Sequence, residues 1–231
     1  MIAKALAQQD VNHNLEADGF TIVANSIPQA VRDHLVVAIA APAGDRQRGL
    51  LANPEIGQLA RSPSLLNLLR PHLEDYPLPV RAIFFDKTSE KNWFVAWHQD
   101  VTLAVRERAE VPGFGPWTVK DGIPHVHAPA KILRQMLTVR IHLDDADETN
   151  GALCVIPGSH RHGKLSPAQI AHMHESAPTH LCRARAGDLL LMRPLLLHAS
   201  HKSVSQAQRR VLHIEYAAFK LPAPLEWHDA A

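Results

Sequence analysis

The sequence is poor in cysteine. Its 231 residues include two, Cys154 and Cys182, and they form no CxxC pair. This pattern argues against a zinc knuckle, a thioredoxin-like site and a disulfide-rich scaffold. We expect two buried free thiols rather than a disulfide between them.

The sequence also lacks a charge excess and a long apolar run. The formal net charge is +1 at pH 7, so bulk charge predicts neither a nucleic acid nor a membrane as partner. The longest apolar run, residues 35–41, is far shorter than the roughly 18 residues that a membrane span needs. The first ten residues show no secretory signal pattern, and we expect a cytoplasmic protein.

Several catalytic motifs are missing as well. The chain contains no G-x-S-x-G, no Walker A sequence, no G-x-G-x-x-G and no H-E-x-x-H. These absences argue against a serine hydrolase, a P-loop NTPase, a dinucleotide-binding enzyme and a zinc protease.

The order of predicted elements favours a fold that is mainly β with flanking helices. Residues 1 to about 75 are mainly helical, with a short strand at 20–24 and helix starts at Ser26-Ile-Pro28, Asn53-Pro54 and Ser62-Pro63. The first of these helices is expected to run to about Ala41. Eight short strands then follow at about 78–217: 80–85, 93–97, 136–143, 152–156, 180–185, 188–192, 195–198 and 211–217. We predict a single domain over 1–231 with a double-stranded β-helix (jelly-roll) core.

One stretch of the β half is long and contains many prolines and glycines. Residues 103–129 carry four prolines and three glycines, and we expect an irregular loop there. A long loop inside a compact domain is often functional, so a lid over the site is our hypothesis.

Histidine is abundant, with 16 in the chain, and four His-x-Asp or His-x-Glu pairs occur. Two histidines and one carboxylate form the iron(II) site of non-haem oxygenases, but one such pair is weak evidence in a histidine-rich chain. Order along the chain discriminates among the pairs. His98-Gln-Asp100 ends the second strand of the β half, and His198 ends the seventh, after the apolar run 195–197. The pairs at His72, His142 and His213 lie too early or too late in the order of predicted strands to supply the first two metal ligands.

A cation for a cosubstrate lies at a suitable spacing. Arg209 follows His198 by eleven residues and begins the last predicted strand. Arginine binds a carboxylate through two parallel hydrogen bonds, as a 2-oxoglutarate site requires. The alternative is that Arg209 and Arg210 form a solvated pair at the strand start.

Three ordered blocks resemble the phytanoyl-CoA dioxygenase family, in particular its bacterial members. They are the metal-ligand segment 85–100 (FDKTSEKNWFVAWHQD), the segment 143–160 with its NGxLxVxPGSH core, and 187–198 (GDLLLMRPLLLH) followed by Ser200 and Arg209. The resemblance covers about residues 16–217. It implies an Fe(II)- and 2-oxoglutarate-dependent oxygenase that uses O₂, releases succinate and CO₂, and hydroxylates an unactivated C–H of a small molecule.

The resemblance also implies roles for individual residues. Iron ligands are expected at His98, Asp100 and His198, and the cosubstrate is expected to contact Arg209, Gln99, Ser200 and Arg140. Lys87 is a further lysine that such a site could use. Related halogenases have a small residue in place of the carboxylate, so Asp100 favours hydroxylation.

Other interpretations stay open at this stage. Trp93, Trp97 and His127 are candidates for substrate contacts, although the tryptophans also fit core packing. A cupin-like metalloenzyme without 2-oxoglutarate and a non-catalytic binding protein of the same fold are the alternative functions. The substrate and the oligomeric state do not follow from the sequence.

Overall fold

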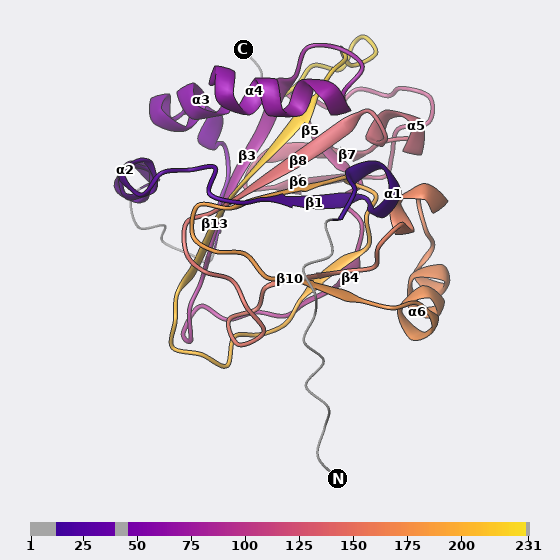
Figure 1. Ribbon diagram of the computed structural model, residues 1–231. Helices are drawn as coiled ribbons and strands as arrows, with labels where there is room; N and C mark the ends of the chain where they lie inside the picture. The colour runs from indigo at the N-terminus through magenta and orange to yellow at the C-terminus, as the bar shows by residue number, and fades with distance from the viewer. Residues whose placement is uncertain (1–12, 40–45, 230–231) are drawn as a thin grey trace.

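The computed structural model describes residues 13–39 and 46–229. Its core is a pair of antiparallel sheets with a third sheet beside them (Figure 1). In spatial order, the large sheet contains β1 (Phe20–Val23), β11 (Leu189–Met192), β8 (Met136–His142), β13 (Arg209–Ala217), β3 (Leu78–Lys87) and β2 (Arg46–Gln47). The second sheet contains β10 (His180–Cys182), β9 (Leu153–Val155), β12 (His198–Ser200) and β4 (Val95–His98). The third contains β5 (Thr102–Ala104), β7 (Ile123–His127) and β6 (Trp117–Lys120).

The helices lie outside the two facing sheets. Figure 1 shows α3 and α4 along one side of the large sheet and α6 on the other side of the molecule, beside β4 and β10. The α-helices are α1 (Leu15–Asp18), α2 (Gln29–Ile39), α3 (Pro54–Ala60), α4 (Pro63–Leu69), α5 (Ala130–Leu133) and α6 (Pro167–Ser176). Short 3-10 helices occupy Leu50–Ala52, Arg70–His72 and Ser159–His162.

The predicted helix starts agree with the structure. The side chains of Asn53 and Ser62 accept hydrogen bonds from backbone N–H groups of the first turns of α3 and α4, and a proline follows each cap. Such caps satisfy N–H groups that have no partner inside the helix. Helix α2 begins at Gln29, directly after Pro28. Its predicted end near residue 41, like any prediction for residues 1–12, lies outside the described residues.

Alternation along the central strand of the large sheet separates a hydrophobic face from a polar one. Leu212, Ile214 and Tyr216 of β13 pack in the hydrophobic cluster that includes residues of α2, α3 and α4. The intervening residues Arg209 and His213 line a cavity on the opposite face. Because side chains in a strand point alternately to the two faces, β13 closes the core and supplies the site at once.

The two facing sheets make a second hydrophobic cluster. Leu190 and Met192 of β11 pack there with Leu153 and Val155 of β9. With two packed antiparallel sheets and flanking helices, the predicted jelly-roll core is confirmed. The N-terminal third is mostly helical as expected but also supplies β1 and β2 to the large sheet.

The predicted irregular loop at 103–129 is only partly correct. Residues 106–116 form no helix or strand, but the strand residues on either side of them belong to the third sheet. Leu103, Val105 and Val126 are buried in a cluster with the C-terminal residues Leu225 and Trp227. Several of its glycines and prolines lie at the turns between strands, which concealed the short strands in the sequence.

Two further boundaries differ from expectation. The strand predicted at 195–198 begins only at His198, because Leu196 closes a turn by donating its N–H to Arg193 O. Helix α6 was not predicted, although Ser166 and Gln169 form a capping box at its start. None of the helices within the described ranges is both long and apolar enough to cross a membrane.

Candidate functional site

A cavity of about 450 Å³ opens between the two facing sheets. Its floor is the polar face of β3, β8 and β13, and its roof is β4, β9 and β12. Thr102 and Lys120 of the third sheet add to its wall. All seven residues predicted to bind metal or cosubstrate line it: His98, Gln99, Asp100, Arg140, His198, Ser200 and Arg209.

The three predicted metal ligands meet at the roof of this cavity. His98 ends β4, and His198 begins the neighbouring strand β12, where the two histidines are paired in register. The turn after β4 returns Asp100 to the same point. One ligand atom from each residue lies within 4.8 Å of the others. Segments that are about a hundred residues apart in the sequence therefore converge on one position.

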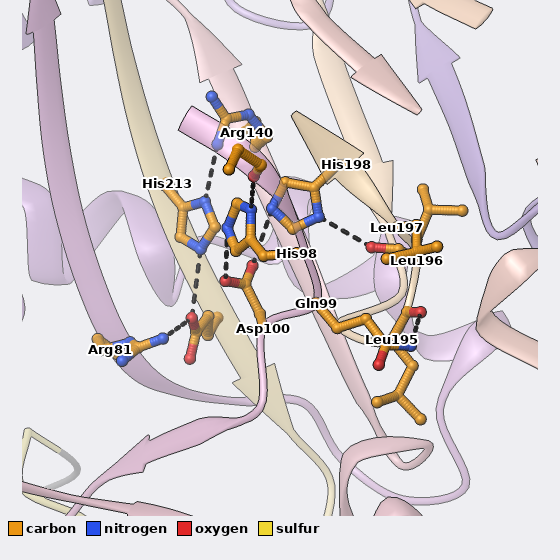
Figure 2. A network of polar contacts seen from close by, with 12 residues as sticks. Arg81, His98, Gln99, Asp100, Arg140, Leu195, Leu196, Leu197, His198 and His213 are labelled. Atoms are coloured by element: carbon orange, nitrogen blue, oxygen red, sulfur yellow. Dashed lines mark hydrogen bonds and ion pairs between the residues drawn. The ribbon is translucent and has the colours of Figure 1, made fainter. Parts of the chain in front are cut away.

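The two imidazoles are oriented by the same type of contact. His98 Nδ1 lies 2.8 Å from Ala96 O, and His198 Nδ1 lies 2.8 Å from Leu196 O. A carbonyl oxygen can only accept, so both Nδ1 atoms carry hydrogen and both Nε2 atoms present a lone pair. Figure 2 shows the two rings and the Asp100 carboxylate directed toward one another.

Distances and electrostatics fit a divalent metal ion. His98 Nε2 is 3.8 Å from Asp100 Oδ1, and His198 Nε2 is 3.7 Å from Asp100 Oδ2. These separations are too long for hydrogen bonds and shorter than two metal–ligand bonds of about 2.1 Å placed end to end. Asp100 Oδ2 is buried and has no hydrogen-bond partner in the described structure. Two neutral imidazoles and one carboxylate are the donor set that suits iron(II).

The protonation states agree with this set. Burial alone would raise the pKa of Asp100, but the facing rings of His198 and His98 hold it well below its usual range. Burial, followed by the influence of His98, lowers the pKa of His198 to about 3. The site therefore offers an ionised carboxylate and a neutral imidazole at pH 7.

Three cations, which we call the inner basic group, lie at or beside one end of the cavity: Arg140 and Arg209 line it, and Lys87 contacts Ser200, which also lines it. Arg209 pairs with Lys87 in the β13–β3 register. All three are buried. Across the described residues, no carboxylate forms an ion pair with any of them, and the Nε atoms of both arginines have no partner. Burial and the nearby Arg140 lower the pKa of Arg209, as expected for a buried charge that lacks a counter-ion.

Ser200 and Lys87 form one unit within this group. Lys87 Nζ donates to Ser200 Oγ at 2.9 Å and to His201 O at 2.7 Å. Ser200 Oγ in turn donates to Gly151 O at 2.8 Å. Lys87, which the sequence offered only as a further candidate, thus lies beside Arg209 and the predicted Ser200.

Gln99 has a different environment from the one expected. Its amide nitrogen donates to Gly163 O at 2.8 Å and Leu195 O at 2.7 Å, and its amide oxygen accepts from Leu165 N at 2.8 Å. In Figure 2 the side chain extends toward Leu195 and away from the ligand cluster. Because these backbone contacts occupy the amide, the geometry favours a role in fixing the turn that carries Asp100 rather than a cosubstrate contact.

The competing His-x-Asp and His-x-Glu pairs are engaged elsewhere. Asp144 pairs with Arg210 through contacts of 2.7 and 2.8 Å. Glu215 and His213 do approach Asp100 closely enough to form a second three-residue cluster. However, Glu215 is paired with Arg81, and His213 Nδ1 lies 3.1 Å from Arg140 Nη1. His213 Nε2 lies 3.3 Å from Glu215 Oε1, so both ring nitrogens of His213 face a polar partner within the protein.

The predicted substrate contacts divide between two locations. Trp93 lines the cavity, and Lys87 Nζ lies 4.9 Å above its ring. Trp97 points to the other face of β4 and lies against His174 of α6, with 5.1 Å between ring centroids. Neither Trp97 nor His127 is among the residues around the cavity. Sequence reasoning missed four cavity-lining cations: Arg46, Arg48, Arg81 and Lys120.

Comparison with known proteins gives a consistent result. Residues 18–211 match the family model described as phytanoyl-CoA dioxygenase (PhyH). The chain is 24% identical over 258 aligned positions to an ectoine dioxygenase of Bordetella bronchiseptica, covering 93% of this chain and 76% of that protein. It is 30% identical over 178 positions to a probable alpha-ketoglutarate-dependent hypophosphite dioxygenase of Stutzerimonas stutzeri, covering 71% of this chain and 53% of that protein.

Solved structures share the fold. HygX from Streptomyces hygroscopicus, crystallised with nickel and 2-oxoglutarate, aligns with a TM-score of 0.64 at 17% identity, over 92% of this chain and 86% of HygX. The alpha-ketoglutarate-dependent carbocyclase SnoK aligns with a TM-score of 0.67 at 16% identity, over 94% of this chain and 85% of SnoK. Since the family model spans most of its length, the chain belongs to the phytanoyl-CoA dioxygenase family and is a non-haem iron(II)- and 2-oxoglutarate-dependent dioxygenase.

Proposed function

We propose that this dioxygenase hydroxylates a C–H group of a small molecule and that His98, Asp100 and His198 bind its iron(II). We further propose that the inner basic group binds the distal carboxylate of 2-oxoglutarate, with Arg209 as its main partner. Ser200 supports the group through its hydrogen bond from Lys87. A cytoplasmic location stays a prediction from the sequence.

One observation carries the proposal: a cluster of metal-ligand atoms and two buried arginines without counter-ions, Arg140 and Arg209, open into the same cavity. A buried cation without an anionic partner is costly, and a dicarboxylate would provide one. A metal enzyme without such a cosubstrate would have no evident need for Lys87, Arg140 and Arg209 in this position.

The residues of the site have separate roles in the proposed reaction. With iron, 2-oxoglutarate and O₂ bound, the cofactor supplies the oxidising chemistry, and succinate and CO₂ are released. The protein holds the cosubstrate through Arg209 at one end and orients the imidazoles through the Ala96 and Leu196 carbonyls. Phe85 and Leu153 line the cavity and reduce its access to water. Asp100 supplies the carboxylate ligand and leaves no room for a halide, which favours hydroxylation.

The test is binding of 2-oxoglutarate to the anaerobic, Fe(II)-loaded protein, followed by the weak visible metal-to-ligand charge-transfer band. We expect the band in the wild-type protein. We expect Arg209→Ala to bind metal but to lose the band at moderate 2-oxoglutarate concentrations. We expect His198→Ala to lose both.

Arg210→Ala is the matched control, since Arg210 adjoins Arg209 but pairs with Asp144 outside the cavity. It is expected to keep the band. Bound iron without a band in the wild type would favour the cupin-like alternative. Absence of metal binding would favour a non-catalytic protein of the same fold.

A further inference from the structure

A second set of cations lines the opposite end of the cavity. It consists of Arg48, Arg81 and Lys120, and we call it the outer basic group. These residues come from the segment after β2, from β3 and from β6. Arg46 also lines the cavity, but it lies over the Trp93 ring, which Lys87 of the inner group also contacts. The cavity is therefore basic at both ends.

Arg209, which pairs with Lys87 on β3, lies too far from Arg81 of the outer group for both to bind the same small anion. Arg81 and Lys87 lie on the same face of β3, six residues apart, which is about 20 Å along an extended strand. Figure 2 shows His98, Asp100 and His198 between Arg140, which belongs to the inner group, and Arg81, which belongs to the outer group. A dicarboxylate held by Arg209 at one end leaves the outer group without a ligand.

Most of the outer cations already have partners in the protein. Arg81 is paired with Glu215, and Arg48 is paired with Asp121. Lys120 differs: it forms no ion pair with any carboxylate of the described residues, and its Nζ lies 3.5 Å from Thr102 Oγ1. Burial lowers the pKa of Lys120, and the nearby Arg81 and Arg48 add to this effect. The Nε atoms of Arg48 and Arg81 are also buried without a partner.

Two neighbouring side chains of β6 are placed in the opposite way to the usual one for their polarity. Val119 points to solvent with 71% of its surface exposed, while its neighbour Lys120 is half-buried and faces the cavity. Burial normally favours valine inside and lysine outside. Lysine is common on edge strands such as β6 because it discourages pairing with other chains, but that role requires a lysine that points outward. The inward lysine indicates a ligand.

We infer that the substrate carries an oxoanion, either a carboxylate or a phosphorus oxoanion, which Lys120 binds together with Arg48 at the outer end of the cavity. This inference rests on the proposed function. It assigns 2-oxoglutarate to the inner end and the anionic group of the substrate to the outer end. The C–H or other bond to be oxidised would then lie near the metal ligands, between the two groups.

The experiment uses the anaerobic Fe(II)- and 2-oxoglutarate-loaded protein and follows the charge-transfer band during titration with three probes. Acetate represents a carboxylate, hypophosphite represents a phosphorus oxoanion, and acetamide is the uncharged match to acetate. The variants are Lys120→Gln and, as matched control, Lys131→Gln, since Lys131 lies on α5 and is exposed to solvent.

We expect at least one anion, but not acetamide, to perturb the band in the wild type and in Lys131→Gln. In Lys120→Gln the affinity should fall about ten- to hundred-fold, the range for losing one hydrogen bond to a charged group. The anion that binds more tightly identifies the chemistry of the substrate group.

Three results would overturn the inference while the 2-oxoglutarate band is intact. The first is an anion affinity in Lys120→Gln equal to that of the wild type, as expected for an anion that simply binds the metal. The others are equal effects of acetamide and acetate on the band, or no response of the band to either anion. Absence of the band in the wild type before any probe is added would instead show that the proposed function fails.

Discussion

At the scale of single residues, the backbone orients the metal-binding rings. Ala96 and Leu196 each lie two positions before a histidine and accept its Nδ1–H. The ring orientation thus depends on strand geometry rather than on a partner side chain. In the proposed metal site this pattern leaves Asp100 as the one charged ligand.

Lys87 predicts a pH dependence of cosubstrate binding. Burial, followed by the nearby charges of Arg209 and Arg140, lowers its pKa to about 7, and Ser200 faces it from β12. A bound dicarboxylate favours the charged form and raises this pKa. The affinity for 2-oxoglutarate is therefore highest below pH 7 and falls as the pH rises through 7 toward the pKa of the complex. Calorimetry between pH 6 and 9 should show this decline, with proton uptake on binding above pH 7.

Lys87→Met is the control for that prediction. It should bind 2-oxoglutarate more weakly at pH 6 and show a nearly flat profile at higher pH. A flat wild-type profile, or a slope that persists in Lys87→Met, would mean that another group is responsible.

Gly151 sets the position of Lys87. Its φ is +79°, and a Cβ atom there would lie 2.6 Å from His201 O and 3.0 Å from Lys87 Nζ. We expect Gly151→Ala to lower the free energy of unfolding by more than the roughly 1–2 kcal/mol that left-handed backbone strain costs. It should also weaken 2-oxoglutarate binding. Chemical denaturation and the charge-transfer titration measure the two effects.

Gly49→Ala separates strain from collision, because Gly49 also has a positive φ of +69° but a Cβ atom added there would meet no other atom within 4 Å. In Gly49→Ala the free energy of unfolding should fall by the cost of backbone strain alone, and the affinity for 2-oxoglutarate should be unchanged. If Gly49→Ala and Gly151→Ala lost the same amount of stability and of 2-oxoglutarate affinity, the steric argument would be refuted.

At the scale of elements, the hairpin of β6 and β7 presents Lys120 to the cavity. Asp121 and Gly122 connect the strands with φ values of +53° and +78°, as in a two-residue type I′ turn. Asp121 also pairs with Arg48. We expect Ala-Ala at these two positions to speed hydrogen exchange in residues 117–127 and to leave 2-oxoglutarate binding unchanged, since the inner basic group lies on other strands.

Asp121→Asn tests which of the two roles dominates, because asparagine tolerates the same backbone conformation but lacks the charge. Slow exchange in Asp121→Asn would assign the effect to the turn, whereas fast exchange would assign it to the ion pair. Loss of 2-oxoglutarate binding in the Ala-Ala variant would contradict the separation of the two ends of the cavity.

Local signals made many elements predictable. Asn53 and Ser62 with their following prolines marked helix starts, and the pattern in residues 211–217 marked a strand, which the structure buries on both faces. The short strands around the prolines of 103–129 were not predictable, because tertiary contacts with the C-terminal segment stabilise them.

The site was predictable to the extent that chain order constrained it. The spacing of His98 and Asp100 and the late position of His198 predicted one cluster, and the structure brings these residues together. The outer basic group was not predictable, because three separate segments contribute to it and no local sequence pattern indicates that they meet. The same holds for Arg81, which lies in the apolar first part of β3 and pairs with Glu215 on the neighbouring strand.

At the scale of the whole molecule, ligand binding should raise stability. The residues that we propose for binding metal and cosubstrate come from β3, β4, β8, β12 and β13 and the turn after β4, a set that forms only in the folded protein. A ligand present at about a hundred times its dissociation constant adds about 2.7 kcal/mol. For a chain of this size that corresponds to a rise in Tm of roughly 5–10 °C.

Differential scanning fluorimetry under anaerobic conditions measures this rise, and a chelator should reverse it. In Arg209→Ala, metal should still raise Tm, whereas 2-oxoglutarate should no longer raise it. A Tm that does not respond to either ligand in the wild type would contradict the assignment of the cavity.

The position of β13 has a consequence for how the protein is made. It is the last of the described strands in the chain, yet it lies between β8 and β3 near the middle of the large sheet. During synthesis on the ribosome, β3 and β8 each keep one unpaired edge until residues 209–217 emerge. Unpaired strand edges are prone to aggregation. The same nine residues bring Arg209 and His213, so a nascent chain gains its central strand and its cosubstrate pocket in a single late step.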